Sequence, residues 1–269
     1  MNEPLVYGCF QGVGLLQAPQ MASLGFACAL STRVGGVTTG EAASMNLSFK
    51  RKDTEENVRE NYRRLAAALG RPLESFCLSR QVHGIAVLEA DAADARRSLA
   101  PGAVSREGDA WISNDSSLTL IRHHADCTPV YLADPEHRAM GLIHAGWKGT
   151  VQSITARTLQ AMTQRYGSRP ERMWALIGPA ISACCFEIGP DVAQLLDEGF
   201  PGAGLVQRRG DSLYGDLKAC NRLQLLQGGL PEAQVLTSTL CTACRNDLLY
   251  SHRREHGHTG IMASVMYLL

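Results

Sequence analysis

The sequence predicts an α+β fold in which mixed β-sheets are layered with helices. Strand-like segments follow one another in the first half of the chain, whereas helices alternate with strands only later, so a strict strand–helix repeat is absent. The 269 residues are 45% hydrophobic and 19% charged, a composition typical of globular proteins. No linker or internal repeat divides the chain, so residues 1–269 are expected to form a single domain.

The first expected elements are a strand over Gly25–Thr32 and a long helix. Asp53 is expected to cap this helix, Glu56 follows three residues later as in a capping box, and Gly70 ends it. Four apolar residues share one face at helical spacing: Val58, Tyr62, Leu65 and Leu69. That face predicts a helix packed against the core.

The middle of the chain contains a series of short apolar runs. Strands are expected over Ile85–Glu89, Ala110–Ser113, Leu118–Arg122, Val130–Ala133 and Met140–His144. The turn Asp134-Pro135 predicts an antiparallel pair from the last two. A helix over Thr150–Tyr166 should end at Gly167.

The last third of the chain alternates between the two element types. A strand over Met173–Ile177, helices over Asp191–Leu196, Leu217–Leu226 and Asn246–Arg254, and a closing strand over Ala263–Leu268 are expected. Surface excursions are expected over Gly35–Ser48, Ala90–Gly108 and Gly199–Gly210.

Charge and hydropathy exclude several classes of function. The 26 basic and 26 acidic residues cancel, so the chain lacks the basic footprint of a nucleic-acid-binding protein. No run approaches the roughly 18 apolar residues of a membrane span, and the amino terminus lacks the pattern of an export signal. The expected location is the cytoplasm, where most of the nine cysteines would stay reduced.

Three segments place a metal-binding side chain beside small residues at an expected strand end. They are Gln81-Val82-His83-Gly84, Ala125-Asp126-Cys127-Thr128-Pro129 and His144-Ala145-Gly146-Trp147-Lys148-Gly149. Two imidazoles and one thiolate with a vacant position describe a catalytic zinc better than a structural one. Such an ion activates water and polarises a leaving group.

Other readings of the cysteines stay open. Cys127 could instead be a nucleophile assisted by a histidine, as in a Cys-His amidohydrolase. Cys184-Cys185 and the Cys241-x-x-Cys244 motif suggest a nucleophile and a redox or zinc-knuckle site, although free thiols are expected for both. A zinc that only braces a partner-binding domain is a non-enzymatic alternative.

Longer motifs occur in a fixed order from about residue 25 to the carboxyl end. Besides the three segments above, they are Ser31-Thr32-Arg33-Val34-Gly35-Gly36-Val37, Met45-Asn46-Leu47-Ser48, Gly178-Pro179-Ala180-Ile181-Ser182-Ala183-Cys184-Cys185-Phe186-Glu187 and Cys241-Thr242. Together they resemble the YfiH/YlmD-like family, described first as multicopper polyphenol oxidases (laccases) and then as purine nucleoside phosphorylases.

The resemblance implies one catalytic domain, similar to that of cytotoxic necrotizing factor toxins, with a zinc held by His83, Cys127 and His144. It also implies that phosphate cleaves adenosine, inosine, guanosine or methylthioadenosine, and that adenosine is deaminated as a further activity. The implied partners are therefore small molecules, with neither nucleic acid nor a membrane among them. Copper is possible, but eight histidines are too few for a confident multicopper cluster, so zinc is preferred.

The substrate-binding candidates follow from the chemistry of phosphorolysis. Lys148 follows a glycine turn at an expected helix start, where free amides attract anions. Arg33 lies in a second glycine-bordered turn, and its planar fork matches phosphate oxygens. Trp147 could stack on the base. For deamination, Asp126 is the first candidate for proton transfer and Glu187 the second, although neighbouring strand residues point to opposite faces.

The chain departs from the family pattern at two positions near its end. Ile261 stands where the family usually has Arg, and His252 stands where it usually has Tyr. The sequence leaves open whether the missing Arg served an ion pair or a substrate contact.

Overall fold

The computed structural model describes residues 2–99 and 106–269, and three sheets organise them. The first sheet contains, in spatial order, β1 (Val6–Phe10), β2 (Val13–Gln17), β3 (Phe26–Ser31), β15 (Met262–Leu268), β7 (Thr119–His124) and β4 (Phe76–Cys77). The second contains β14 (Val235–Thr237), β10 (Trp174–Ile177), β8 (Thr128–Asp134), β9 (Ala139–Ala145), β6 (Ala110–Ser113) and β5 (Val87–Glu89). Both mix antiparallel and parallel pairs.

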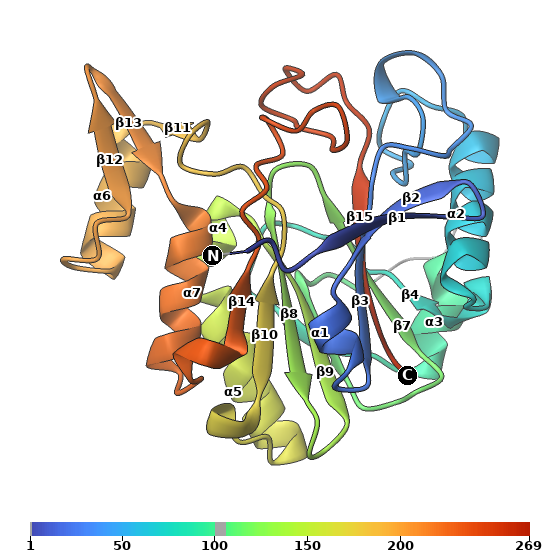
Figure 1. Ribbon diagram of the computed structural model, residues 1–269, viewed down its shortest axis with the longest axis horizontal. Helices are drawn as coiled ribbons and strands as arrows, with labels where there is room; N and C mark the ends of the chain where they lie inside the picture. Colours follow the sequence, from blue (N-terminus) through green and yellow to red (C-terminus); the bar gives the residue numbers. More distant parts are fainter. Residues whose placement is uncertain (1, 100–105) are drawn as a thin grey trace.

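Helices flank the two sheets. They are α1 (Pro19–Ala22), α2 (Glu55–Leu69), α3 (Ala92–Ser98), α4 (Trp147–Val151), α5 (Ile154–Tyr166), α6 (Pro190–Gly199) and α7 (Leu217–Gln227), with short 3₁₀ turns at Gly40–Ala42, Leu73–Ser75, Pro170–Arg172 and Glu232–Gln234. Helix α2 lies on one side of the molecule and α5 and α7 on the other, with the sheets between them (Figure 1). The expected α+β layering is confirmed.

Each interface between layers is apolar. The two sheets bury residues such as Leu30 and Met266 against Trp111, Tyr131 and Leu142. A second cluster packs α2 on the outer face of the first sheet, and a third packs α5 and α7 on the outer face of the second. At about 25 cal/mol per Å² of buried apolar surface, these interfaces supply the main stabilising term.

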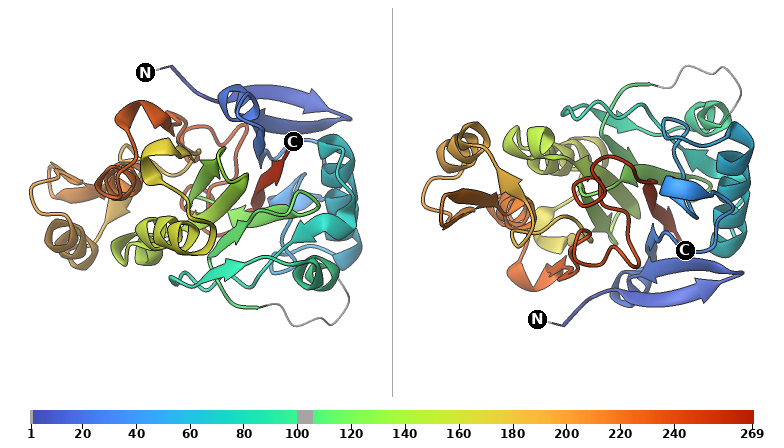
Figure 2. Two further views of the ribbon diagram at one scale, coloured as in Figure 1. Left: turned by 90° about the horizontal axis from the view of Figure 1, so that it is seen from below. Right: turned by 90° about the horizontal axis from the view of Figure 1, so that it is seen from above.

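A small third sheet lies apart from the main layers. It contains β11 (Glu187–Ile188), β13 (Ser212–Gly215) and β12 (Val206–Arg209), and with α6 it extends from one end of the molecule (Figures 1 and 2). The sequence analysis predicted part of this region as an irregular excursion. In the described residues, no helix combines the length and the apolar character that crossing a bilayer requires.

Most expected elements are confirmed within a few residues, including β3, β6, the antiparallel pair of β8 and β9, α7 and β15. The predicted buried face of α2 is also confirmed, and Gly70 ends that helix in the left-handed conformation. The excursion predicted over Ala90–Gly108 instead contains α3, and residues 100–105 of it lie outside the described residues. The similarity to cytotoxic necrotizing factor toxins stays a prediction.

Some other local predictions were wrong. Thr54, not Asp53, caps α2, because its hydroxyl accepts from the Asn57 amide while the Asp53 carboxylate binds neighbouring side chains. The helix expected over Thr150–Tyr166 is two helices, because Ser153 adopts a left-handed conformation with φ of 63°. Hydrophobic periodicity predicts which face of a helix is buried, but it does not predict a single left-handed residue that interrupts the helix.

The helix expected over Asn246–Arg254 does not form. Successive turns replace it, and side chains satisfy part of the backbone: the Ser251 amide donates to Glu255 and the Arg253 amide donates to Asp126. The contact with Asp126 ties the segment to a distant part of the chain, which local propensity does not encode.

Candidate functional site

Two histidines and one cysteine meet where the central strands β8 and β9 of the second sheet begin and end, respectively. His83 lies in the loop between β4 and β5, Cys127 lies in the turn between β7 and β8, and His144 is the penultimate residue of β9. One potential ligand atom from each lies within 4.8 Å of the other two. The three side chains that the sequence suggested as a group therefore lie together.

Strand pairing explains how Cys127 reaches His144. In the antiparallel pair of β8 and β9, Pro129 lies opposite His144 and Thr128 lies opposite Ala145. Cys127 immediately precedes β8, so the pairing brings it to the end of β9, where the two side chains can converge. Because β7 ends at His124, the residues of the turn escape the alternation of a strand.

Gly146 leaves the space in which the three side chains converge. A Cβ atom at this position would lie 2.9 Å from His83 Cδ2 and 3.3 Å from Cys127 Sγ. Any larger residue would have to displace one of the candidate ligands. Glycine at the end of β9 is therefore a steric requirement of the site.

Asp109 fixes two of the three candidate ligands. Its Oδ1 accepts from His144 Nδ1 at 2.9 Å and from the His83 amide at 3.0 Å. Its Oδ2 accepts from the amides of Val82 and Gly84 at 3.1 and 2.9 Å. A carboxylate on the far nitrogen of a ligating histidine sets its tautomer and orientation, so Nε2 of His144 is left for a metal.

Asp109 was not among the site residues expected from the sequence. The available signal was an acidic residue at the start of a buried strand, because such a carboxylate needs partners that compensate its burial. Asp109 is fully buried, and hydrogen bonds from His144 and the loop amides outweigh the effect of burial and lower the pKa of Asp109.

Electrostatics favour a cation between these side chains. Burial lowers the pKa of His144 despite its hydrogen bond to Asp109, so the imidazole is neutral and able to bind a metal. Burial, followed by the charges of Asp126 and Asp109, raises the pKa of Cys127 to about 12. A thiol with this pKa is a poor free nucleophile, whereas a bound metal would hold it as thiolate.

The three side chains open into a pocket of about 980 Å³. This volume lies at the upper end of the roughly 300–1,000 Å³ typical of small-molecule sites. Its wall combines aromatic and cationic side chains. The aromatic ones are Phe49, Trp147 and Phe186, and the cationic ones are Lys50, Arg51, Arg80 and Arg253. Such a wall suits a ligand with a flat ring and a negative charge.

Arg33 and Lys148 lie outside the lining of this pocket. The Arg33 guanidinium donates to the carbonyl of Asn246 and to Glu255, and it stacks on the Tyr250 ring. Lys148 is exposed, and its Nζ lies 5.6 Å from the centroid of the Trp147 ring. The structure therefore brings Trp147 to the pocket but does not bring these two cations there.

The two proton-transfer candidates differ in position. Asp126 lines the pocket, but both its oxygens are engaged, one by the Thr242 hydroxyl at 2.6 Å and one by the Arg253 amide at 2.7 Å. Glu187 is exposed on β11, accepts from Ser212 and does not line the pocket.

Both departures from the family pattern belong to the pocket wall. His252 and Ile261 line the same cavity as His83 and Cys127. At position 261, where the resemblance led to an expected arginine, an apolar side chain faces the cavity. The two positions therefore bear on which ligand the pocket accepts.

Comparisons with known proteins identify the family of the chain. Residues 27–269 match the family model described as multi-copper polyphenol oxidoreductase laccase. A purine nucleoside phosphorylase of Deinococcus radiodurans is 39% identical over 257 residues, which cover 96% of this chain and 94% of the relative. The purine nucleoside phosphorylase YlmD of Geobacillus stearothermophilus is 34% identical, with 91% and 90% covered.

Solved structures show the same fold. The crystal structure of YlmD from Geobacillus stearothermophilus superimposes with a TM-score of 0.93 at 30% identity, covering 99% of each chain. The YfiH structure from Bacillus licheniformis gives a TM-score of 0.89 at 29% identity, covering 95% of this chain and 96% of that one. This chain belongs to the YfiH/YlmD-like, multi-copper polyphenol oxidoreductase laccase family.

Proposed function

We propose that this protein is a zinc-dependent purine nucleoside phosphorylase. The observation that carries the proposal is the convergence of His83, Cys127 and His144 at the end of a pocket large enough for a nucleoside and a phosphate. The names of the relatives from Deinococcus radiodurans and Geobacillus stearothermophilus support the reaction class. The substrates would be adenosine, inosine, guanosine and methylthioadenosine.

The donor set fits zinc. Two neutral imidazoles and one thiolate with an open position form a set typical of catalytic zinc, and Asp109 supplies the outer hydrogen bond that such a histidine usually makes. Zinc held there would act as a Lewis acid toward the departing purine. Copper is disfavoured, because in the described residues this is the one histidine-containing group of three or more donors.

The pocket wall supplies the remaining requirements of phosphorolysis. Trp147 and Phe186 offer flat apolar surfaces for the base, and stacking of this kind is worth about 1–3 kcal/mol per base. In the described part of the chain, Arg51 and Arg253 have no carboxylate within ion-pair distance, whereas Arg80 pairs with Glu107. Arg51 and Arg253 are therefore our candidates for orienting phosphate toward the ribose.

The anion site has two competing assignments. The sequence analysis predicts that Arg33→Ala and Lys148→Ala each raise the phosphate concentration needed for turnover. From the structure we expect a larger rise in the required phosphate concentration for Arg51→Ala and Arg253→Ala, because these side chains line the cavity. Measuring the KM for phosphate in all four variants decides between them, and no change in Arg51→Ala and Arg253→Ala would remove the wall assignment.

Adenosine deamination is kept as a further proposed activity, but the wall favours phosphorolysis. Of the described lining residues, Glu107 and Asp126 are the carboxylates, and both are already paired. Proton transfer during deamination needs a group that is free to exchange a proton with the substrate. We expect ammonia release from adenosine to be slower than phosphate-dependent release of adenine.

A Cys-His amidohydrolase is the second candidate, because Cys127, His144 and Asp109 also stand in the order of a nucleophile, a base and its orienting group. The raised pKa of Cys127 speaks against it.

One assay separates the two enzymes. Inosine is incubated with and without phosphate, before and after metal removal by a chelator. A phosphorylase forms hypoxanthine and ribose 1-phosphate only with phosphate, and it loses activity with the metal. Phosphate-independent turnover of an amide by the metal-free protein, stopped by thiol alkylation, would overturn the proposal.

A further inference from the structure

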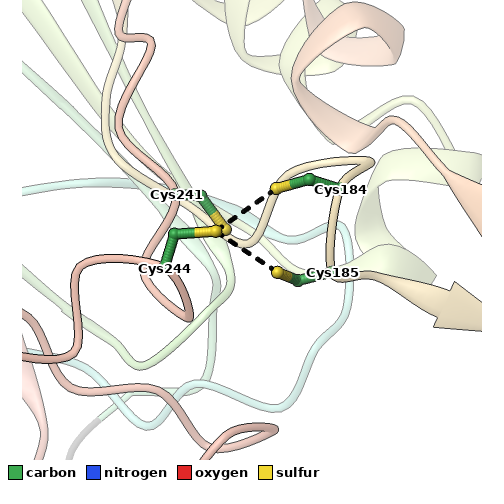
Figure 3. A group of neighbouring side chains, drawn as sticks. All are labelled: Cys184, Cys185, Cys241 and Cys244. Atoms are coloured by element: carbon green, nitrogen blue, oxygen red, sulfur yellow. Dashed lines mark hydrogen bonds between the residues drawn. The ribbon is translucent and has the colours of Figure 1, made fainter.

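A second group of potential metal ligands lies outside the pocket. Cys184 and Cys185 occupy the turn before β11, and Cys241 and Cys244 occupy the segment that follows β14 (Figure 3). All four Sγ atoms lie within 4.8 Å of one another. The two pairs are more than fifty residues apart in the sequence, so the fold itself assembles this group.

The sulfur–sulfur distances match a metal centre rather than disulfides. Cys244 Sγ lies 3.6 Å from Cys184 Sγ and 3.4 Å from Cys185 Sγ, and all four thiols are unbridged. A disulfide needs about 2.05 Å. Four sulfurs at about 2.3 Å from a tetrahedral zinc lie about 3.8 Å from one another. We propose that Cys184, Cys185, Cys241 and Cys244 bind a second zinc ion, in a closed structural site.

The backbone around the thiols is already ordered in the way that a metal site requires. The Ser182 amide donates to Cys241 Sγ at 3.4 Å, as amides do toward metal-bound thiolates. A β-bridge joins Ala180 to Cys241, and the Thr242 amide donates to the Ala180 carbonyl at 3.2 Å. The two cysteine-bearing segments are therefore held in register beside each other.

The charge of the surroundings also fits. Zinc with four thiolates carries a net charge of −2. Lys218, buried in α7, donates to the carbonyls of Ser238 and Leu240, directly before Cys241. Within the described ranges, no carboxylate lies at ion-pair distance from Lys218. An anionic cluster beside this segment would supply the compensating charge that a buried ammonium needs.

The position of the cluster gives the ion a structural task. Residues 238–261 contain no helix or strand, and loops of this length are uncommon unless something else orders them. The same segment carries three residues of the pocket wall, His252, Arg253 and Ile261. A metal that joins Cys241 and Cys244 to the turn at 184–185 would anchor the segment without lying in the pocket.

A hydrogen bond connects the segment that carries Cys241 to the turn that carries Cys127. Thr242, next to Cys241, donates to Asp126, which precedes Cys127. Because all four positions around the ion are filled by protein, we expect it to bind no substrate. The proposal is independent of the reaction class, since it depends only on the four thiols and their surroundings.

Metal counting tests the proposal. Wild-type protein, purified without chelator, should contain two zinc ions per chain by elemental analysis. Cys244→Ser and Cys185→Ser should each contain one, Cys127→Ala should contain one, and the Cys127→Ala/Cys244→Ser double variant should contain none. Cys9→Ser is the matched control, because Cys9 is exposed and belongs to neither group of potential ligands, and it should keep both ions.

A spectroscopic measurement on intact wild-type protein covers the case in which the cysteine variants fail to fold. Cobalt replaces zinc in the full chain, and the intensity of thiolate-to-cobalt charge transfer rises with the number of thiolate ligands. Filling both sites should give the signal of five thiolates, and Cys127→Ala should retain that of four. A four-thiol signal missing from Cys127→Ala, or intact masses showing disulfides among the four cysteines, would overturn the proposal.

Discussion

Potential metal ligands meet in two places in this protein, and the two places differ in whether a coordination position would stay free for a ligand. At the pocket, three donors of two kinds converge, with Gly146 keeping the space clear and Asp109 orienting His144. Near the small third sheet, four thiols converge outside the pocket lining. Three donors leave a position for chemistry, whereas four close the shell. The comparison teaches that donor number and surroundings, rather than the presence of cysteine, separate a catalytic site from a structural one.

The two places are connected as well as different. The Thr242–Asp126 hydrogen bond runs from the segment of Cys241 to the turn of Cys127. Loss of the proposed structural ion should therefore disturb the pocket indirectly, whereas loss of the pocket ion should leave the cysteine cluster intact. The predictions below test this asymmetry.

The largest effect is expected from removal of a pocket ligand. Cys127→Ala and His83→Ala should lower the rate of inosine phosphorolysis by about 10³-fold or more, because a Lewis acid supplies several kcal/mol and each 1.4 kcal/mol is tenfold. Steady-state assays at saturating phosphate measure it. Cys28→Ser, a buried thiol away from both sites, is the control. Activity near the wild-type level in both pocket variants would contradict the role proposed for a pocket ion.

The next largest effect is expected at Asp109. Asp109→Asn removes the carboxylate that orients His144, and loss of such a partner weakens metal affinity by about 10–100-fold. Competition with a chromophoric chelator measures the metal affinity of the pocket site, while an ion bound at the cysteine cluster, as proposed, should be unaffected. Asp247→Asn is the control, since Asp247 is exposed and pairs only with Arg245. Equal affinity in the two variants would show that Asp109 has only a folding role.

A smaller effect is expected from filling the space at Gly146. Gly146→Ala places a methyl group 2.9 Å from His83 Cδ2, and overpacking of this kind costs about 1–3 kcal/mol. We expect roughly tenfold weaker metal binding at the pocket and a comparable loss in rate. Gly199→Ala is the control, because nothing lies within 4 Å of the added methyl there. Indistinguishable metal affinities would argue against close convergence of the three ligands.

The smallest effect is expected from removing the Thr242–Asp126 hydrogen bond between the two places. Thr242→Val keeps the shape of the side chain but removes the hydrogen bond to buried Asp126, at a cost of about 1 kcal/mol. For a chain of this size, Tm should fall by about 2–4 °C in a thermal melt. Thr239→Val removes an exposed hydroxyl–carboxylate bond and should change Tm little. A fall as large in Thr239→Val would mean that burial of Asp126 is unimportant.

Sequence reasoning predicted much of the fold because burial follows periodicity. The apolar face of α2 and the uniformly buried strands β8 and β9 are visible as spacing and as apolar runs. The left-handed residue Ser153 and the turns at 246–254 were missed, because distant side chains and single backbone conformations determine them. Local sequence carries little information on either.

The candidate site shows the same division. His83, Cys127 and His144 could be proposed because small residues flank them in segments that end strands, and because the resemblance to the YfiH/YlmD-like family implied the same three ligands. Asp109 was missed, since the acidic residue before a buried strand was a weak signal and its role depends on three loop amides and a histidine 35 residues away. Arg33 and Lys148 were plausible by local chemistry, yet the fold positions both outside the pocket lining. The cysteine pairs were visible, but nothing in their spacing showed that they meet.

Anomalous diffraction at the zinc edge, on crystals of the active wild-type protein, tests the central claim most directly. The account predicts a peak coordinated by His83, Cys127 and His144, with its remaining side toward the pocket. A protein that cleaves inosine with phosphate, but shows no peak among these three side chains, would contradict it.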